Sequence, residues 1–142
     1  MKVINEQSIG RDTARNFRQL NEELVAAAAS ATTYTDSLAK PSAWVTVSSF
    51  SNSWVAFGAG WSTPRYRKIG DIVYVQGMIK DGTSGLACFT LPVGFRPTEI
   101  QVFHSTTSTG VVRMDVGSNG QVIVYAGGAG VWAGINCQFA TT

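Results

Sequence analysis

A heptad pattern of apolar residues near the N-terminus is the feature that most restricts the fold of this chain. Such a pattern places its residues on one side of a helix, as the a and d positions of a coiled coil. We call this set the seam, and its spacings alternate between three and four residues: Phe17, Leu20, Leu24, Ala27, Ala31, Tyr34 and Leu38. Asp12 is expected to cap the start of the helix, and Pro41 to end it.

The seam is narrow and the predicted helix is long. Polar Asn21 and Thr32 lie close beside the apolar positions, as in a coiled coil and unlike the wider stripe of a core-facing helix. At 1.5 Å per residue the helix would extend about 40 Å, longer than one face of a domain of about 100 residues requires. These features favour association with other helices, and packing on the chain's own domain is the alternative. The mixture of Phe, Leu, Ala and Tyr does not decide the number of helices.

The composition changes at Pro41. Residues 1–41 contain ten charged side chains, and residues 42–142 contain ten in a segment more than twice as long. We therefore predict two parts, an N-terminal anchor with a coiled-coil helix in residues 1–41 and a β-sandwich head domain in residues 42–142. Residues 1–10, with Val3 and Ile4 ahead of a polar run, are expected to form an extended anchor strand.

Alternating apolar residues predict that the head is all β. Asp71–Ile79 is apolar on both faces, which indicates a strand covered on both sides. The stretch from Val111 to Tyr125 predicts a hairpin, with Asn119-Gly120 supplying the positive φ angles of its tight turn. A last strand is expected to turn Ala133 to Phe139 inward at alternate positions. About eight short strands with frequent turn signals indicate an antiparallel β-sandwich or barrel.

The sequence offers little for catalysis. His104 is the only histidine, and one histidine cannot build a metal site alone. The head has four carboxylates, of which two follow or precede glycine at turn positions: Asp71, Asp81, Glu99 and Asp115. Cys88 and Cys137 are expected to be buried free thiols. We predict no catalytic residues, no metal and no cofactor, although the sequence does not exclude a facing carboxylate pair such as a glycosidase uses.

Composition also restricts the partners. The net charge of +2 is too small to indicate a nucleic acid or an anionic membrane. No apolar run approaches the roughly 18 residues of a membrane span. The basic stretch Arg65–Lys68 either contacts phosphate groups or forms the solvated edge of a sheet, and the edge is favoured.

Four aromatic residues in or beside Gly-, Ser- and Thr-rich turns are candidates for contact with a receptor or partner: Trp54, Trp61, Tyr66 and Trp132. Each belongs either to the core or to a binding surface. Exposed aromatic rings suit stacking on sugars or packing against a protein. Trp61 and Tyr66 are the stronger candidates for exposure.

Two segments of the head resemble small bacteriophage virion fibre and tail-tip proteins. Gly60–Pro97 contains a Tyr-Arg-Lys-x-Gly-Asp-x-Val strand, Tyr66–Val73, and a Leu-Pro-x-Gly-Phe-Arg-Pro turn, Leu91–Pro97. Many such proteins carry these motifs, with Tyr where this chain has Phe95, and a later hairpin similar to "VGSNGQVIVY". The resemblance covers about half of the chain. It implies a trimeric β head that is attached to the particle through its N-terminal segment.

The function that the resemblance implies is structural. The chain would be a non-enzymatic homotrimeric tail-tip or fibre module on the virion surface, assembled in the host cytoplasm and contacting the host cell envelope. Its partners would be further copies of itself, other virion proteins at the N-terminal segment, and a host surface glycan or protein, with no nucleic acid and no membrane insertion. A head fibre or capsid decoration protein is the nearer alternative, and a glycan-degrading enzyme is the more distant one.

Overall fold

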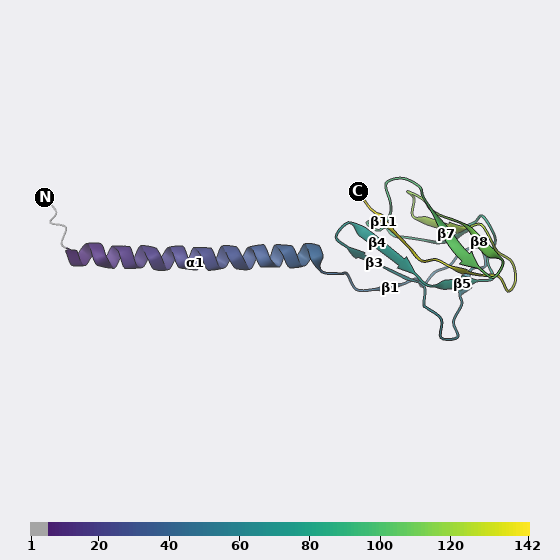
Figure 1. The fold of residues 1–142 in the computed structure, drawn as a ribbon, viewed down its shortest axis with the longest axis horizontal. Helices are drawn as coiled ribbons and strands as arrows, with labels where there is room; N and C mark the ends of the chain where they lie inside the picture. Colours follow the sequence, from purple (N-terminus) through teal and green to yellow (C-terminus); the bar gives the residue numbers. More distant parts are fainter. Residues whose placement is uncertain (1–5) are drawn as a thin grey trace. The chain divides into compact units, whose positions relative to one another are not determined.

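The computed structural model describes residues 6–142, without the side chains of residues 6–9 and 36–39. Two compact units make up the chain, and the second runs Pro41–Thr142. The first contains the single long helix α1 (Glu6–Ala39), and the second contains short antiparallel strands (Figure 1). The expected class, a mainly β protein with one long N-terminal helix, is therefore confirmed.

Helix α1 is longer than predicted. Its 34 residues extend about 51 Å at 1.5 Å per residue. It begins at Glu6, so Asp12 lies inside the helix and is not its cap. The helix continues through Gly10, because one glycine costs a helix only about 1 kcal/mol relative to alanine. The extended strand expected over residues 1–10 is wrong from Glu6 onward, and residues 1–5 lie outside the described part. The helix ends two residues before Pro41, as predicted.

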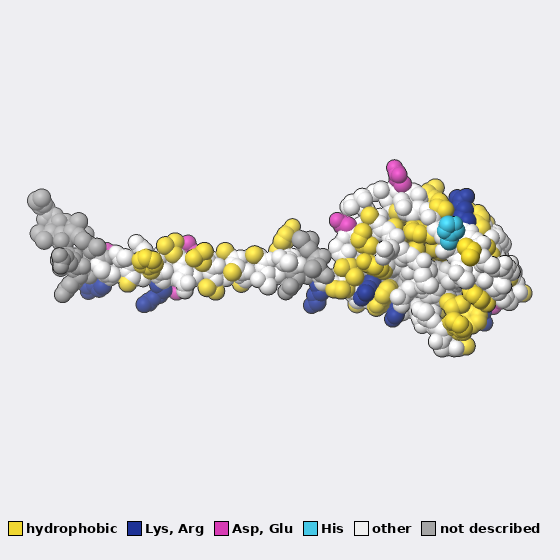
Figure 2. Space-filling view, in the orientation of Figure 1, with side chains coloured by type: hydrophobic (Ala, Val, Ile, Leu, Met, Phe, Trp, Pro, Cys, Tyr) yellow, Lys and Arg dark blue, Asp and Glu magenta, His cyan; other side chains and the backbone are white. Residues whose placement is uncertain are grey.

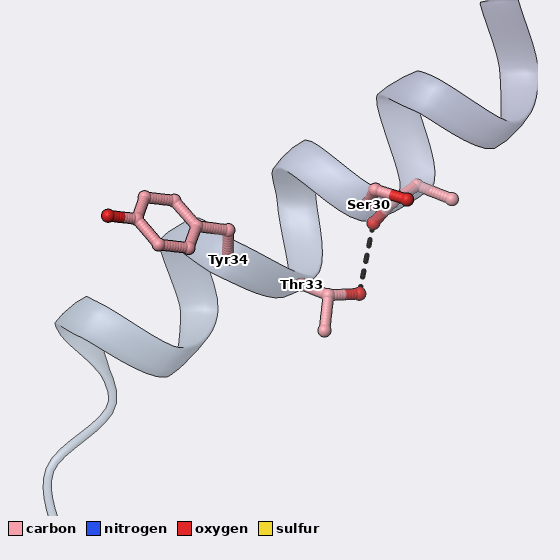
Figure 3. A pocket seen from close by; sticks show the side chains of 4 residues that line it. Ser30, Thr33 and Tyr34 are labelled. Carbon is pink, nitrogen blue, oxygen red and sulfur yellow. Dashed lines mark hydrogen bonds between the residues drawn. The ribbon is translucent and has the colours of Figure 1, made fainter.

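The surface of α1 combines apolar and polar side chains along its length (Figure 2). Thr33 donates its hydroxyl proton to the carbonyl oxygen of Ala29 at 2.9 Å, and Thr32 and Thr35 make the same bond to the residue four positions before them. Figure 3 shows Thr33 turned back in this way, while the ring of Tyr34 extends away from it. These hydroxyls are satisfied within the helix, which lets polar threonines lie beside the seam. Among residues 6–142, no helix has the length and hydropathy that a membrane crossing needs.

The head consists of two antiparallel sheets (Figure 1). The four-stranded sheet has the order β1-β3-β4-β11, with the bounds Val45–Thr46, Arg65–Ile69, Ile72–Gln76 and Cys137–Ala140. The seven-stranded sheet has the order β2-β5-β10-β7-β8-β9-β6, with the bounds Val55–Ala56, Met78–Lys80, Trp132–Gly134, Gln101–Thr107, Gly110–Val116, Gln121–Val124 and Ala87–Thr90.

Two segments predicted as continuous strands pass from one sheet to the other. The first divides at Gly77 into β4 and β5, and the second divides at Ile135 and Asn136 into β10 and β11. Ile135 donates its N–H to the Gly77 carbonyl at 3.0 Å, and the Gly77 N–H donates to Asn136 Oδ1 at 3.2 Å. Gly77 has a φ of 138°, and a Cβ there would overlap the backbone of Pro64. Only glycine fits this crossing point.

The inward faces of both sheets fill one core. Val73 of β4 and Met114 of β8 are each fully buried, as are Val122 and Val124 of β9. The predicted β8–β9 hairpin is therefore confirmed, but its turn differs from the expected one. Gly120 alone has a positive φ, of 87°, and the neighbouring Asn119 instead accepts the N–H of Gln121 on its Oδ1 at 3.0 Å.

The turn Leu91–Pro97 is stabilised by contacts of its own residues and of the four-stranded sheet. Leu91 is fully buried, and Gly94 adopts a φ of 92°. The Arg96 Nε–H donates to the Leu91 carbonyl at 2.8 Å, which closes the turn. Phe95 then packs edge-to-face on Tyr66 with 5.0 Å between ring centroids.

Candidate functional site

The loop between β2 and β3 projects from the head below β5 in Figure 1. Its two ends are bonded to one residue of β5, because Phe57 donates its N–H to the Met78 carbonyl and Met78 donates its own to Ser62, each at 2.9 Å. Residues 58–60 all have positive φ, of 72°, 50° and 81°, and the Trp61 N–H donates to the Gly58 carbonyl at 3.0 Å. The loop is therefore fixed at its base and bends sharply at its tip.

Trp61 is held in one orientation and remains accessible. Its ring packs edge-to-face on Phe57, with 5.8 Å between centroids and an interplanar angle of 83°. The Nζ of Lys80 lies 5.4 Å from the centroid of the same Phe57 ring. Trp61 is nevertheless 57% exposed, and Figure 2 shows hydrophobic side chains gathered on this protrusion.

Strand β10 brings Trp132 to the same face of the seven-stranded sheet. Trp132 lies opposite Lys80 of β5, and Val55 of β2 lies opposite Lys80 on its other side. The next pair along these strands, Ala133 and Ile79, is fully buried. Because neighbours in a strand point to opposite faces, Trp132, Lys80 and Val55 point outward. We call these three residues, together with Phe57 and Trp61, the aromatic patch.

The patch suits recognition better than catalysis. Half-exposed aromatic rings beside an ammonium group can stack on the C–H face of a sugar or pack against a protein side chain. Asp81, next to Lys80, is the nearby carboxylate, and its Oδ1 already accepts the Gly130 N–H at 2.7 Å. No nucleophile–base pair is present within the patch.

Two of the four aromatic candidates thus lie in the patch, and two do not. Trp54 is only 1% exposed, and its indole ring occupies the space that a side chain at position 82 would need, which Gly82 leaves open. Assigning Trp54 to a contact surface is therefore wrong. Tyr66 lies on the core side of the four-stranded sheet against Phe95, where burial raises the pKa of its phenol.

Sequence reasoning missed Val55, Phe57 and Lys80 in the patch. Phe57 lies two residues after Val55, so the period of a strand already places both side chains on one face. That signal was available in the sequence. Lys80 carried no such signal, because its position depends on the pairing of β5 with both β2 and β10.

A second group of aromatic and basic side chains lies on the outer face of the four-stranded sheet. The Cζ atoms of Arg65 and Arg67 lie 4.6 and 4.4 Å from the centroid of the Trp44 ring. The Arg67 Cζ also lies 6.0 Å from the ring of Tyr74. Strand β3 pairs with β1 as well as β4, so the expectation that Arg65–Lys68 forms a sheet edge is wrong. Each cation–π contact contributes about 0.5–1 kcal/mol at an exposed site.

A third group forms a structural network on β8. Arg113 donates from Nε and Nη2 to the two oxygens of Asp115, at 2.7 and 2.6 Å. The Tyr125 hydroxyl donates to Asp115 Oδ2 at 3.1 Å. Asp115 is 5% exposed and the ion pair raises the pKa of Arg113, so this carboxylate is committed to its partners. His104 lies opposite Arg113 on β7 and is exposed.

The carboxylates outside this network come from different parts of the head. Asp71 lies in the turn between β3 and β4, 3.9 Å from the Lys68 Nζ, and Glu99 lies in the loop before β7 of the other sheet. In the described part of the chain, no three His, Cys, Asp or Glu side chains are placed to hold a metal ion. Cys88 and Cys137 are free thiols, and burial raises the pKa of each to about 12.

A long N-terminal helix followed by a head of two antiparallel sheets is an architecture found in a phage receptor-binding protein. The fold is similar to the crystal structure of the receptor binding protein (gp15) of Listeria phage PSA, with a TM-score of 0.67 and 16% identity. The match covers 100% of this chain and 99% of that one. The resemblance to phage receptor-binding proteins is thereby confirmed at the level of the fold. The sequence matches no known family model and no curated protein.

Proposed function

We propose that the chain is a non-enzymatic structural protein of a bacteriophage virion, a homotrimeric tail-tip or fibre module that contacts the host cell envelope. The observation that carries this proposal is the likeness of fold to the phage protein, which extends over essentially the whole of both chains. That protein is a receptor binding protein by name, and we assign the same class of role to this chain.

The seam of α1 supports association between copies of the chain. Phe17, Leu24 and Tyr34 are 70%, 69% and 67% exposed, and Leu20 is 56% exposed. Leaving such apolar area in water costs about 25 cal/mol per Å², and helices in proteins gain most of their stability from packing an apolar face. Association of three helices would cover the seam. Leu38, its last position, lies outside the described side chains.

The aromatic patch supports the contact with the host. Trp61 is well exposed, and its loop is bonded at both ends to Met78 of β5. A fixed, exposed indole binds a sugar or a protein surface with little loss of side-chain freedom. We assign Trp61, Trp132 and Lys80 to this contact, and we assign the N-terminal segment to docking on other virion proteins.

The mass in solution tests the trimer. Light scattering on the full chain should give three times the protomer mass of 15.1 kDa. A monomer at micromolar concentration would contradict the proposal, because the seam would then have no partner helix.

Antibody labelling of phage particles tests the location. Gold-labelled antibodies against the head should mark the tail tip in electron micrographs. Labelling over the capsid would instead establish a head fibre or decoration protein, and particles without label would reject a virion role. Release of soluble fragments from host polysaccharide by the purified chain would establish the enzymatic alternative.

A further inference from the structure

The two arginines of β3 that flank Trp44 differ in how their guanidinium groups are satisfied. The Gln76 amide is assigned the orientation in which its oxygen faces Arg65. In this orientation the oxygen accepts hydrogen bonds from Arg65 Nη2 and Nε, at 2.7 and 2.8 Å. Arg67 has no such acceptor, and its Nε is buried without a hydrogen-bond partner among the described residues. A buried guanidinium N–H without an acceptor is unfavourable. Arg67 is therefore the less satisfied of the two arginines, and its side chain also lines a hollow on this face.

The charge around Arg65 and Arg67 is also unbalanced. The ion pairs of the head join Lys68 to Asp71, Lys80 to Asp81 and Arg113 to Asp115, and none of those described involves either arginine. Two guanidinium groups close to one indole ring repel each other, and the ring offsets only part of that repulsion. An oxyanion would relieve it, and the planar fork of arginine matches phosphate and carboxylate.

Arg67 lines a hollow whose other walls suit a sugar. We call it the arginine hollow, and its walls include Trp44, Arg67, Tyr74, Gln76, Asn136 and Gln138. Its volume of about 360 Å³ falls within the range of roughly 300–1,000 Å³ for small-molecule sites. The Oδ1 of Asn136 is already bonded to the Gly77 N–H, which leaves its amide N–H groups as donors. The exposed Gln138 offers both a donor and an acceptor.

We propose that the arginine hollow binds an anionic saccharide, a sugar that carries a phosphate or carboxylate group. The oxyanion lies on the Arg67 guanidinium, the sugar ring lies against Tyr74, and the amides of Asn136 and Gln138 bond its hydroxyl groups. This inference does not depend on a virion role, because it concerns the head as a binding protein. The arginine hollow lies on the four-stranded sheet and is separate from the aromatic patch.

Nuclear magnetic resonance on the full-length chain tests the proposal directly. The probe signal is the indole N–H of Trp44, assigned through a Trp44→Phe variant. We expect a saturable shift with glucose 1-phosphate or with glucuronate, and the tighter of the two identifies the anion. Glucose and inorganic phosphate should each bind at least tenfold more weakly, because each lacks half of the recognised group. No shift with either anionic sugar, or equal binding of glucose, would overturn the proposal.

Matched variants separate a site from general attraction of anions. Arg67→Gln should weaken binding at least tenfold, and Arg67→Lys should weaken it less because the charge remains. Lys68→Gln removes the same charge from the same strand, but its side chain reaches Gly94 on the opposite face. Binding in this control should stay within twofold of the parent. Equal losses in Arg67→Gln and Lys68→Gln would show that no specific site exists.

A further variant keeps the test valid if Arg67→Gln does not fold. Gln138 is exposed on β11, so Gln138→Glu should fold and should place a negative charge in the arginine hollow. We expect at least a tenfold loss of binding for the anionic sugar. Parent affinity in Gln138→Glu would overturn the proposal.

Discussion

Trp54 and Trp61 lie seven positions apart and have opposite environments. Trp54 is 1% exposed and Trp61 is 57% exposed. Both follow small residues in turn-like sequence, so local composition does not clearly distinguish them. The difference comes from Gly82, which is distant in sequence and whose missing side chain makes room for the Trp54 ring. Burial of an aromatic residue in a turn therefore depends on tertiary contacts that a local pattern does not contain.

Alanine at these two positions should separate stability from recognition. Trp54→Ala should lower the free energy of unfolding by about 3–5 kcal/mol, as for other buried aromatic residues. Trp61→Ala should change it by less than about 0.5 kcal/mol while weakening attachment to host cells. Urea denaturation and a cell-binding assay measure the two effects. Equal losses of stability would show that the Trp61 loop is part of the core.

The buried thiols predict a stability that falls at high pH. Burial raises the pKa of each thiol to about 12 in the folded chain, well above that of a thiol in water. The neutral thiol is favoured by folding, so this stabilisation is complete below about pH 9 and is lost as the pH rises toward 12. Relative to Cys88→Ala, the parent chain should lose about 1 kcal/mol of unfolding free energy per pH unit above pH 9. Urea titrations of both proteins at pH 8 and 10.5 measure this, and a constant difference would contradict it.

At the scale of elements, the two strands that cross between sheets decide the architecture of the head. Only Gly77 separates β4 from β5, and only two residues separate β10 from β11. The crossing strands are bonded to each other at Gly77 and Ile135. Each sheet therefore takes two of its strands from segments that also serve the other sheet.

Alanine at Gly77 should be much more damaging than alanine at another glycine of similar backbone angle. Gly77 and Gly110 have φ values of 138° and 124°, but a Cβ at Gly110 meets nothing within 4 Å, whereas one at Gly77 overlaps Pro64. Strain of the backbone angle alone costs about 1–3 kcal/mol, which is the loss expected for Gly110→Ala. Gly77→Ala should exceed that loss clearly in thermal denaturation. Similar melting temperatures for the two variants would show that the crossing point adapts.

Several strands of the head, and the faces that they bury, could be predicted from the sequence. Alternation identified the β8–β9 hairpin and the inward residues of the last strands, because period-2 burial is local. The division at Gly77 was not predictable, since apolar residues continue on both sides of it and only the approach of Pro64 requires a break. In the same way the aromatic patch combines β2, β5 and β10, which are far apart in the chain. Of the three patch residues that were missed, the place of Lys80 in particular depends on this strand pairing.

At the scale of the whole molecule, α1 and the head follow different rules of stability. The head buries its own core, whereas the seam of α1 is exposed in the single chain. The stability of the helix should then depend on protein concentration, because association links folding to mass action.

Two neighbouring substitutions test whether the seam is the surface that associates. Leu24 and Val25 are both exposed apolar residues, at 69% and 62%, but only Leu24 belongs to the seam. Leu24→Asp should convert the proposed trimer to monomer in light scattering at micromolar concentration, because partner helices would desolvate a charge at an a position. Val25→Asp places the same charged residue one position further along the helix, outside the seam, and should keep the mass of the parent chain. Dissociation of both variants to the same extent would reject the seam as the interface.

The short first strand of the head has a mechanical consequence. Strand β1 is the first element after the helix, it has only two residues, and it lies at the edge of its sheet. Tension applied through α1 would reach the head at Ser42, whose N–H is bonded to the Lys68 carbonyl, and then at β1. These few bonds would yield one after another, up to the bond between Val47 and Pro64. Tension along the chain would therefore lengthen it by separating β1 from β3 while the crossing strands stayed paired. The two-sheet core of the head would stay folded after these first residues had been released.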